Sequence, residues 1–235
     1  MDVILVPGFW LGANSWDEVV PVIEAAGHRP RALTLPGLDS VDTDRSQIGL
    51  SDHVDAVVAA IDEADAPVAL VGHSGGGPIA YGAADRRVDR VATIIYVDTW
   101  PLGEGIPINP DFTVVDGSVP LPDWSEHDPV DVAGLDDAHR ARMEALAVPE
   151  PARVTSDGQQ LHDERRRSIP STIISTSRSR SDYDEWLGHP FMAELGTLDN
   201  VTWVELPTGS HWPHISHPRE VGEAVTHALG ELAEK

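Results

Sequence analysis

Residues 68–80 read Val-Ala-Leu-Val-Gly-His-Ser-Gly-Gly-Gly-Pro-Ile-Ala, and this stretch decides the fold. Four apolar residues, the pattern Gly-x-Ser-x-Gly and a helix-compatible segment follow one another, which predicts a strand, a tight turn and a helix. Glycine is needed at Gly72 and Gly76 because side chains there would collide with neighbouring structure. The turn presents the Ser74 hydroxyl at the carboxyl end of a sheet and directs the Gly75 amide towards a developing oxyanion.

A glycine-rich turn between a strand and a helix can instead be purely structural or can bind phosphate. The stretch contains neither Gly-Lys-Ser/Thr, which a P-loop requires, nor Gly-x-Gly-x-x-Gly, which binds dinucleotides. In this context we interpret Ser74 as a nucleophile.

Short apolar runs recur on both sides of this stretch. Most are continuous rather than alternating, which is typical of strands buried on both faces of a parallel sheet. Helical patterns separate them, so we predict an α/β fold with a doubly wound, mainly parallel sheet of about six strands. The predicted strands are Val3–Val6, Ala32–Leu35, Val68–Val71, Val91–Val97, Thr172–Ile174 and Val201–Leu206.

Two of the helical patterns are amphipathic. Val54, Val57, Val58 and Ile61 recur at helical spacing behind Ser51, a candidate N-cap. A second pattern follows Pro218, which suits the first turn of a helix. Both helices should pack on the sheet.

The alternation of strands and helices is interrupted between residues 103 and 167. Proline, aspartate and glycine are frequent there, and one helix is predicted around Asp136–Ala147. Such a segment is either an irregular surface excursion or a lid over an active site, and the motifs favour a lid. Residues 1–102 and 168–235 then form the core, and residues 103–167 form the lid.

A serine nucleophile needs a general base, and in this architecture the histidine follows the last strand. His211 occupies that position. The spacing His211-x-x-His214-x-x-His217 also suggests a zinc site, but Pro213 and Pro218 break the helical face that would align the three rings. We therefore assign His211 as the base and expect no metal.

The chain resembles the α/β-hydrolase superfamily, and within it the plant-type methylesterase and hydroxynitrile lyase branch. The resemblance rests on residues 6–16 (Val-Pro-Gly-Phe-Trp-Leu-Gly-Ala-Asn-Ser-Trp), the turn at Ser74 and residues 211–218 (His-Trp-Pro-His-Ile-Ser-His-Pro). In the family, the first loop reads His-Gly and then a residue whose amide is the second oxyanion donor. Pro7 replaces that histidine, Gly8 is retained, and Phe9 stands at the donor position.

The resemblance leaves the third catalytic residue open. Most members carry an aspartate just after the strand that follows the lid, but Thr172–Ser179 contains none, and Asp182 and Asp184 come several residues later. Some relatives carry the acid at the end of the preceding strand, where Asp98 stands. We favour Asp98, with Asp182 or Asp184 as the alternative acid, because either strand end can reach the histidine.

The same residues separate reactions within the family. Hydroxynitrile lyases of this branch use a threonine in the first loop and a lysine beside the histidine, where Gly8 and Trp212 stand. Haloalkane dehalogenases need an aspartate nucleophile, which Ser74 excludes.

Composition narrows the functional classes further. The chain has 39 acidic and 16 basic residues and a formal net charge of −23, which disfavours nucleic acid and anionic membranes as partners. It has no cysteine, so a thiolate nucleophile and disulfides are excluded. A basic leader and a long apolar segment are not found, so a cytoplasmic location is expected.

The predicted activity is hydrolysis of a small or medium neutral carboxylic ester or lactone, without a cofactor. Trp10, His73, Trp100 and Trp212 are candidate pocket residues because each stands close to a proposed catalytic position. The alternatives are a receptor-like module that binds a ligand with slow or no turnover, and hydrolysis of a C–C bond or a lactam by the same residues.

Overall fold

The computed structural model describes residues 1–233. Within that range six parallel strands form one sheet in the order β2-β1-β3-β4-β7-β8, which confirms the predicted fold class. The strands are β1 (Asp2–Val6), β2 (Arg29–Ala32), β3 (Val68–His73), β4 (Val91–Val97), β7 (Ser171–Ser175) and β8 (Val201–Glu205).

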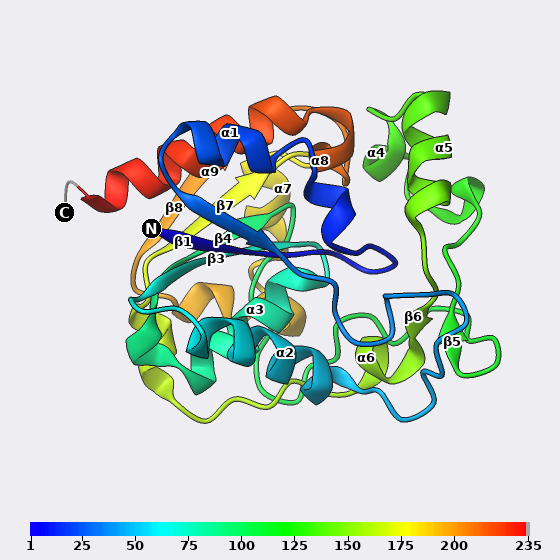
Figure 1. Cartoon of the computed structure of the whole chain (residues 1–235), viewed down its shortest axis with the longest axis horizontal. Helices are drawn as coiled ribbons and strands as arrows, with labels where there is room; N and C mark the ends of the chain where they lie inside the picture. The colour runs from blue at the N-terminus through cyan, green and yellow to red at the C-terminus, as the bar shows by residue number, and fades with distance from the viewer. Residues whose placement is uncertain (234–235) are drawn as a thin grey trace.

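Helices cover both faces of the sheet (Figure 1). One face packs against α1 (Val20–Ala25) and α9 (Pro218–Ala233), and the other against α2 (Leu50–Asp62) and α3 (Gly76–Arg86). Alternate residues of each central strand enter the two cores, which is why these strands are apolar without interruption. The helix predicted to begin at Pro218 is confirmed by α9.

Two predicted boundaries are wrong. The strand expected at Ala32–Leu35 is β2, Arg29–Ala32, which lies at the sheet edge with Arg29 and Arg31 exposed. An edge strand faces water, so it need not be a continuous apolar run. Helix α2 begins behind Gly49 rather than Ser51, and the Asp52 carboxylate accepts the Gly49 N–H at 2.8 Å.

The strand order reverses beside β1, since the chain proceeds from β1 to β2 on one side and from β3 to β4, β7 and β8 on the other. A crevice opens at such a switch point outside the carboxyl ends of the strands. The loops after β1 and β3 border this crevice, so the order of the strands brings Phe9 and Ser74 to the same place.

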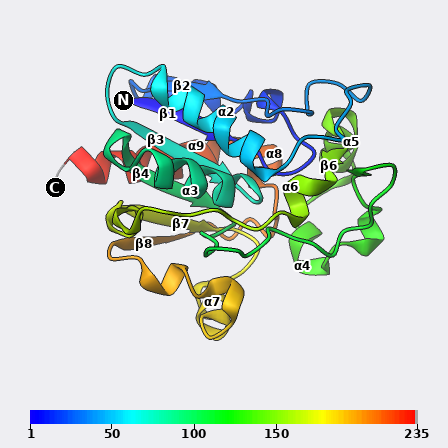
Figure 2. The same cartoon turned by 90° about the horizontal axis from the view of Figure 1, so that it is seen from below.

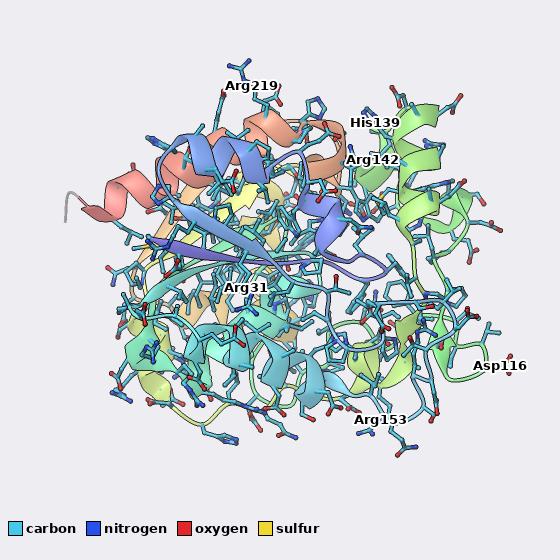
Figure 3. All side chains as sticks on the ribbon, viewed as in Figure 1. Arg31, Asp116, His139, Arg142, Arg153 and Arg219 are labelled. Atoms are coloured by element: carbon cyan, nitrogen blue, oxygen red, sulfur yellow. The ribbon has the colours of Figure 1, made fainter. Side chains whose placement is uncertain are left out.

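Residues 103–167 are hereafter called the excursion. Most of the excursion lies beyond the carboxyl ends of the strands, and its last part runs back to the amino end of β7 (Figures 1 and 2). The predicted helix is confirmed by α5 (Asp137–Leu146). The excursion also contains α4 (Pro129–Val132), α6 (Ala152–Ser156) and the antiparallel pair β5 (Ser118–Val119) and β6 (Glu150–Pro151). These elements were not predicted because each is too short to show a periodic pattern. Figure 3 labels Asp116 and Arg153 on its exposed outer side.

Two short helices follow the last strands, α7 (Arg180–Trp186) after β7 and α8 (Pro213–Ser216) after β8. The 3₁₀ helices are Ala13–Trp16, Val88–Arg90, Trp124–Glu126, Glu164–Ser168, Pro190–Met192 and Leu195–Thr197. Within residues 1–233, no helix has the length and apolar character that crossing a membrane requires.

Candidate active site

Ser74 stands in the tight turn between β3 and α3. Its φ is +49°, in the left-handed region that few residues with a side chain adopt. A Cβ atom on Gly72 would lie 2.6 Å from the carbonyl oxygen of Gly76, and one on Gly76 would lie 2.5 Å from that of Pro7. Only glycine fits these two positions, so close packing of backbone on backbone holds the serine in its strained conformation.

His211 lies in the loop after β8 and faces this serine. Its Nε2 is 2.8 Å from Ser74 Oγ, and its Nδ1 is 2.7 Å from Asp98 Oδ2. The backbone of His211 is fixed from two sides, because its N–H donates to the carbonyl oxygen of Asp131 at 2.8 Å and its own carbonyl accepts from His73 Nε2 at 2.6 Å. The ring is thus oriented between a hydroxyl and a carboxylate.

Asp98 follows β4 and is buried, with a φ of +51°. Its Oδ1 accepts the N–H groups of Thr176 at 2.8 Å and Ser177 at 2.9 Å, and its Oδ2 accepts the Ser177 hydroxyl at 2.7 Å. Burial alone would raise the pKa of Asp98, but His211 and the Ser177 donors outweigh it and hold that pKa well below its ordinary value. The carboxylate is ionised at neutral pH.

The effect on His211 is reciprocal. Burial opposes the charged imidazolium, but the hydrogen bond and negative charge of Asp98 more than compensate and raise the pKa of His211 above its ordinary value of 6.5. Asp98 therefore orients the imidazole and stabilises its protonated form, the two roles that an acid performs beside a catalytic base.

The alternative acids lie elsewhere. Asp182 is half-buried and belongs to the capping box of α7, where its Oδ2 accepts the Ser179 N–H at 2.7 Å. Asp184 is exposed and pairs with Arg180 at 2.8 Å. Neither carboxylate contacts His211, so the structure brings Asp98, and not Asp182 or Asp184, to this histidine.

Phe9 and Gly75 belong to loops that touch. A Cβ atom on Gly75 would lie 2.6 Å from the ring of Phe9, and one on Gly8 would lie 2.6 Å from Nδ1 of His73. Within residues 1–233, neither the Phe9 nor the Gly75 N–H donates to a protein acceptor. The two amides predicted as oxyanion donors are thus on adjoining loops beside Ser74 and are free to bind a ligand oxygen.

A cavity of about 380 Å³ opens over Ser74 and His211. Three predicted pocket residues, Trp10, Trp100 and Trp212, line it. The prediction for His73 is wrong, because its fully buried ring packs below the site against His211, with ring centroids 5.1 Å apart. Burial lowers the pKa of His73 to about 3, so this imidazole is neutral.

Sequence reasoning missed most of the cavity wall. Arg178, Tyr183 and Trp186 follow β7, and the rule that loops after parallel strands border the site could have indicated them. The excursion supplies another group of lining residues, which follow no periodic pattern in the sequence. That group comprises Ile108, Asn109, Phe112, Glu126, His127, Asp128 and Asp131.

Arg178 links the excursion to the sheet. Its guanidinium donates to Asp131 and to Asp128, each at 2.8 Å, and lies 5.1 Å from the ring centroid of Trp186. Since the Asp131 carbonyl accepts the His211 N–H, helix α4 is attached both to the loop after β7 and to the histidine.

His214 is fully buried and does not face the cavity. Its ring stacks on Trp16, with centroids 4.7 Å apart, and packs against His73 at 4.3 Å. Across residues 1–233, no three histidine, aspartate or glutamate side chains are grouped so that they could hold a metal ion.

Several curated proteins are similar to part of the chain. A carbendazim hydrolyzing esterase of a Nocardioides strain is 29% identical over 99 residues, which cover 41% of each chain. Esterase PIR7B of Oryza sativa subsp. japonica is 36% identical over 99 residues, or 40% of this chain and 37% of the esterase. Methylesterase 8 of Arabidopsis thaliana is 36% identical over 101 residues, or 41% and 37%. The aligned part thus spans about two fifths of these relatives.

Solved structures match over nearly the whole chain. An extracellular alpha/beta-hydrolase from a Paenibacillus species has a TM-score of 0.77 at 19% identity and covers 97% of this chain and 98% of that one. An Arabidopsis methylesterase has a TM-score of 0.77 at 17% identity, with coverage of 98% and 99%. The model of the alpha/beta hydrolase family matches residues 3–224. With this match over nearly its full length, the chain belongs to the alpha/beta hydrolase family.

Proposed function

We propose that the chain is a serine hydrolase that cleaves a small or medium neutral carboxylic ester or lactone through an acyl-enzyme. The observation that carries the proposal is the hydrogen-bonded series Ser74, His211 and Asp98 at the floor of an aromatic-walled cavity. The names of the similar proteins, which include methylesterases and other esterases, support the same reaction class.

In the proposed reaction, Ser74 Oγ attacks the ester carbonyl carbon while His211 Nε2 takes its proton. The amides of Phe9 and Gly75 donate to the resulting oxyanion. The tetrahedral intermediate collapses, and His211 returns the proton to the departing alkoxide, which leaves as the alcohol. A water molecule, deprotonated by His211, then attacks the acyl-enzyme and releases the acid and Ser74.

The cavity favours neutral substrates. Within the described residues, Arg178 is the one arginine that lines it, and both sides of its guanidinium are occupied by Asp128 and Asp131. The consecutive Arg165, Arg166 and Arg167 pair with carboxylates away from the cavity. A free anionic group on the substrate would therefore lack a cationic partner.

We propose residues 103–167 as the lid and residues 1–102 and 168–235 as the core. The support is that the excursion supplies one wall of the cavity and bonds to His211 through Asp131. The position of Asp98 beside His211 supports turnover over the alternative of a receptor-like module with slow or no turnover.

The test is labelling with a fluorophosphonate probe together with hydrolysis of 4-nitrophenyl butyrate. Wild type is expected to be labelled and to turn over, whereas Ser74→Ala loses both. Ser156→Ala, on an exposed serine of α6, is the matched control and retains both. Equal labelling of wild type and Ser74→Ala would exclude Ser74 as the nucleophile.

A further inference from the structure

Glu150 of β6 holds the loop that carries Phe9. This side chain is 1% exposed, and its Oε2 accepts the backbone N–H of Trp10 at 3.0 Å, although the two residues are 140 positions apart. Glu150 neither lines the cavity nor contacts Ser74 or His211. A buried acid is therefore bonded directly beside the proposed oxyanion donor without being part of the site itself.

The loop needs such support because its backbone is strained. The Gly8 carbonyl accepts the Leu11 N–H at 3.3 Å, which closes a four-residue turn with Phe9 and Trp10 at its centre. Trp10 has a φ of +67°, the conformation of the third residue in a type II turn, where glycine or asparagine is usual. Reversal of the central peptide gives a type I turn, in which this residue has a negative φ and no strain.

Three hydrogen bonds from the excursion oppose that reversal. The Trp10 carbonyl accepts the Val148 N–H at 2.8 Å, and the indole N–H of Trp10 donates to the Val119 carbonyl at 3.0 Å. The third bond, from the Trp10 N–H to Glu150, is the one that acts on the central peptide of the turn. Removing its acceptor leaves a buried N–H unpaired and favours the type I form.

The other oxygen of Glu150 faces a second buried residue. Its Oε1 is 3.7 Å from Nδ1 of His53, whose Nε2 donates to the Pro36 carbonyl at 2.8 Å, so Nδ1 carries no proton in the neutral ring. Burial raises the pKa of Glu150 to about 8 and lowers that of His53 to about 4, so both are neutral at pH 7. The carboxyl accepts the Trp10 N–H through Oε2, and the amide of a glutamine, which has the same size, retains that acceptor.

We propose that Glu150 is a positioning residue for the oxyanion donor: by accepting the Trp10 N–H, it holds the central peptide of the Gly8–Leu11 turn. It thereby fixes the place of Phe9, whose own N–H belongs to the preceding peptide, beside Ser74. This inference rests on the proposed ester hydrolysis. The excursion then acts on the reaction through this turn as well as through the cavity wall.

The test compares Glu150→Met, which fills the space but removes the acceptor, with Glu150→Gln, which retains it. With 4-nitrophenyl butyrate, Glu150→Met should lower kcat by about 10–100-fold and change KM by less than about threefold, because the oxyanion forms only after binding. The inhibition constant of a trifluoromethyl ketone, whose adduct with Ser74 carries an oxyanion, should rise by the same factor. Glu150→Gln should stay within about threefold of wild type in kcat.

A second background separates positioning from folding. Glycine adopts a positive φ without strain, so in Trp10→Gly the added Glu150→Met change should lower kcat by less than about threefold. The inference is overturned if Glu150→Gln loses as much as Glu150→Met, if the loss is equal in both backgrounds, or if Glu150→Met is unfolded in both. If wild type turns over the ester and Glu150→Met has the same kcat, this inference alone is overturned. If wild type neither turns over the ester nor is labelled at Ser74, the proposed function is overturned.

Discussion

Oδ2 of Asp98 lies 2.7 Å from Nδ1 of His211, although Asp98 directly follows β4, the strand before the excursion, and His211 follows the last strand. The loop after β7 contributes donors in place of an acid, because the N–H groups of Thr176 and Ser177 bind Asp98. The carboxylate that faces His211 therefore comes from the end of β4, and the loop after β7 supplies the hydrogen bonds that hold this carboxylate.

Replacing Asp98 by asparagine should lower kcat by about 10²–10⁴-fold, because the amide neither fixes the required histidine tautomer nor stabilises the imidazolium. Asp182→Asn and Asp184→Asn are the matched controls and should stay within about twofold of wild type. Steady-state hydrolysis of 4-nitrophenyl butyrate, with thermal unfolding as the check on folding, measures all three. Full turnover by Asp98→Asn would exclude it as the acid.

The pH profile should carry the signature of the same pair. His211 acts as a base only when its ring is neutral, and Asp98 raises its pKa, so kcat/KM should increase with pH through a midpoint above 6.5. In Asp98→Asn the favourable charge is lost while burial remains, which moves the midpoint of the residual activity to lower pH. A midpoint that is the same in both proteins would show that Asp98 does not set the pKa of His211.

The sequence predicted the parts of the molecule that backbone geometry dictates. There is no space for a side chain at Gly72 or Gly76, so the turn at Ser74 can be predicted from the residue types alone. The acid was harder to assign, because Asp98 and Asp182 both follow strands and only the path of the chain decides which one meets His211. The assignment of the acid therefore depends on the tertiary structure, which no local sequence pattern encodes.

Other features were outside the reach of local patterns. His73 stands next to the nucleophile in sequence but points into the core, where it binds the His211 carbonyl. Glu150 reads as one acid among 39, and its role follows from a contact with Trp10 across 140 positions. Such pairings arise from the packing of the excursion on the sheet, which depends on long-range contacts.

Arg178 should matter for substrate binding through helix α4. Arg178→Met removes the guanidinium, and with it the bonds to Asp128 and Asp131 and the contact with the Trp186 ring. The wall of the cavity is then no longer bonded to the loop after β7. We expect KM for 4-nitrophenyl butyrate to rise by about 3–10-fold with a loss of unfolding free energy of about 1 kcal/mol or less, since these pairs are partly exposed. Arg219→Met, on an exposed arginine of α9, is the control. Equal KM values for the two variants would exclude the role of Arg178 in substrate binding.

The packing of the Ser74 turn on the first loop can be tested by adding one methyl group. Gly76→Ala brings a Cβ atom within 2.5 Å of the Pro7 and Val6 carbonyl oxygens, so we expect a loss of about 2–4 kcal/mol in unfolding free energy. Gly230→Ala, in α9 with open space around it, should instead gain about 0.5–1 kcal/mol. Urea unfolding measures both, and a neutral Gly76→Ala would contradict the close contact.

Glu150 should make stability depend on pH in a defined direction. Its pKa is raised by burial from an ordinary value of 4.5 to about 8, so between these values the folded chain binds more protons than the unfolded chain. Stability from this group is therefore complete below about pH 4.5 and is lost as the pH rises through about 8. His53, with its pKa lowered to about 4 from 6.5, is present in wild type and in Glu150→Gln alike, so its own titration does not change the difference between the two proteins. Glu150→Gln cannot ionise, so its Tm relative to wild type should increase by about 2–8 °C between pH 6.5 and pH 8.5. A constant difference in Tm across this range would mean that the carboxyl group is already ionised in the folded protein, which would contradict the rise of its pKa by burial.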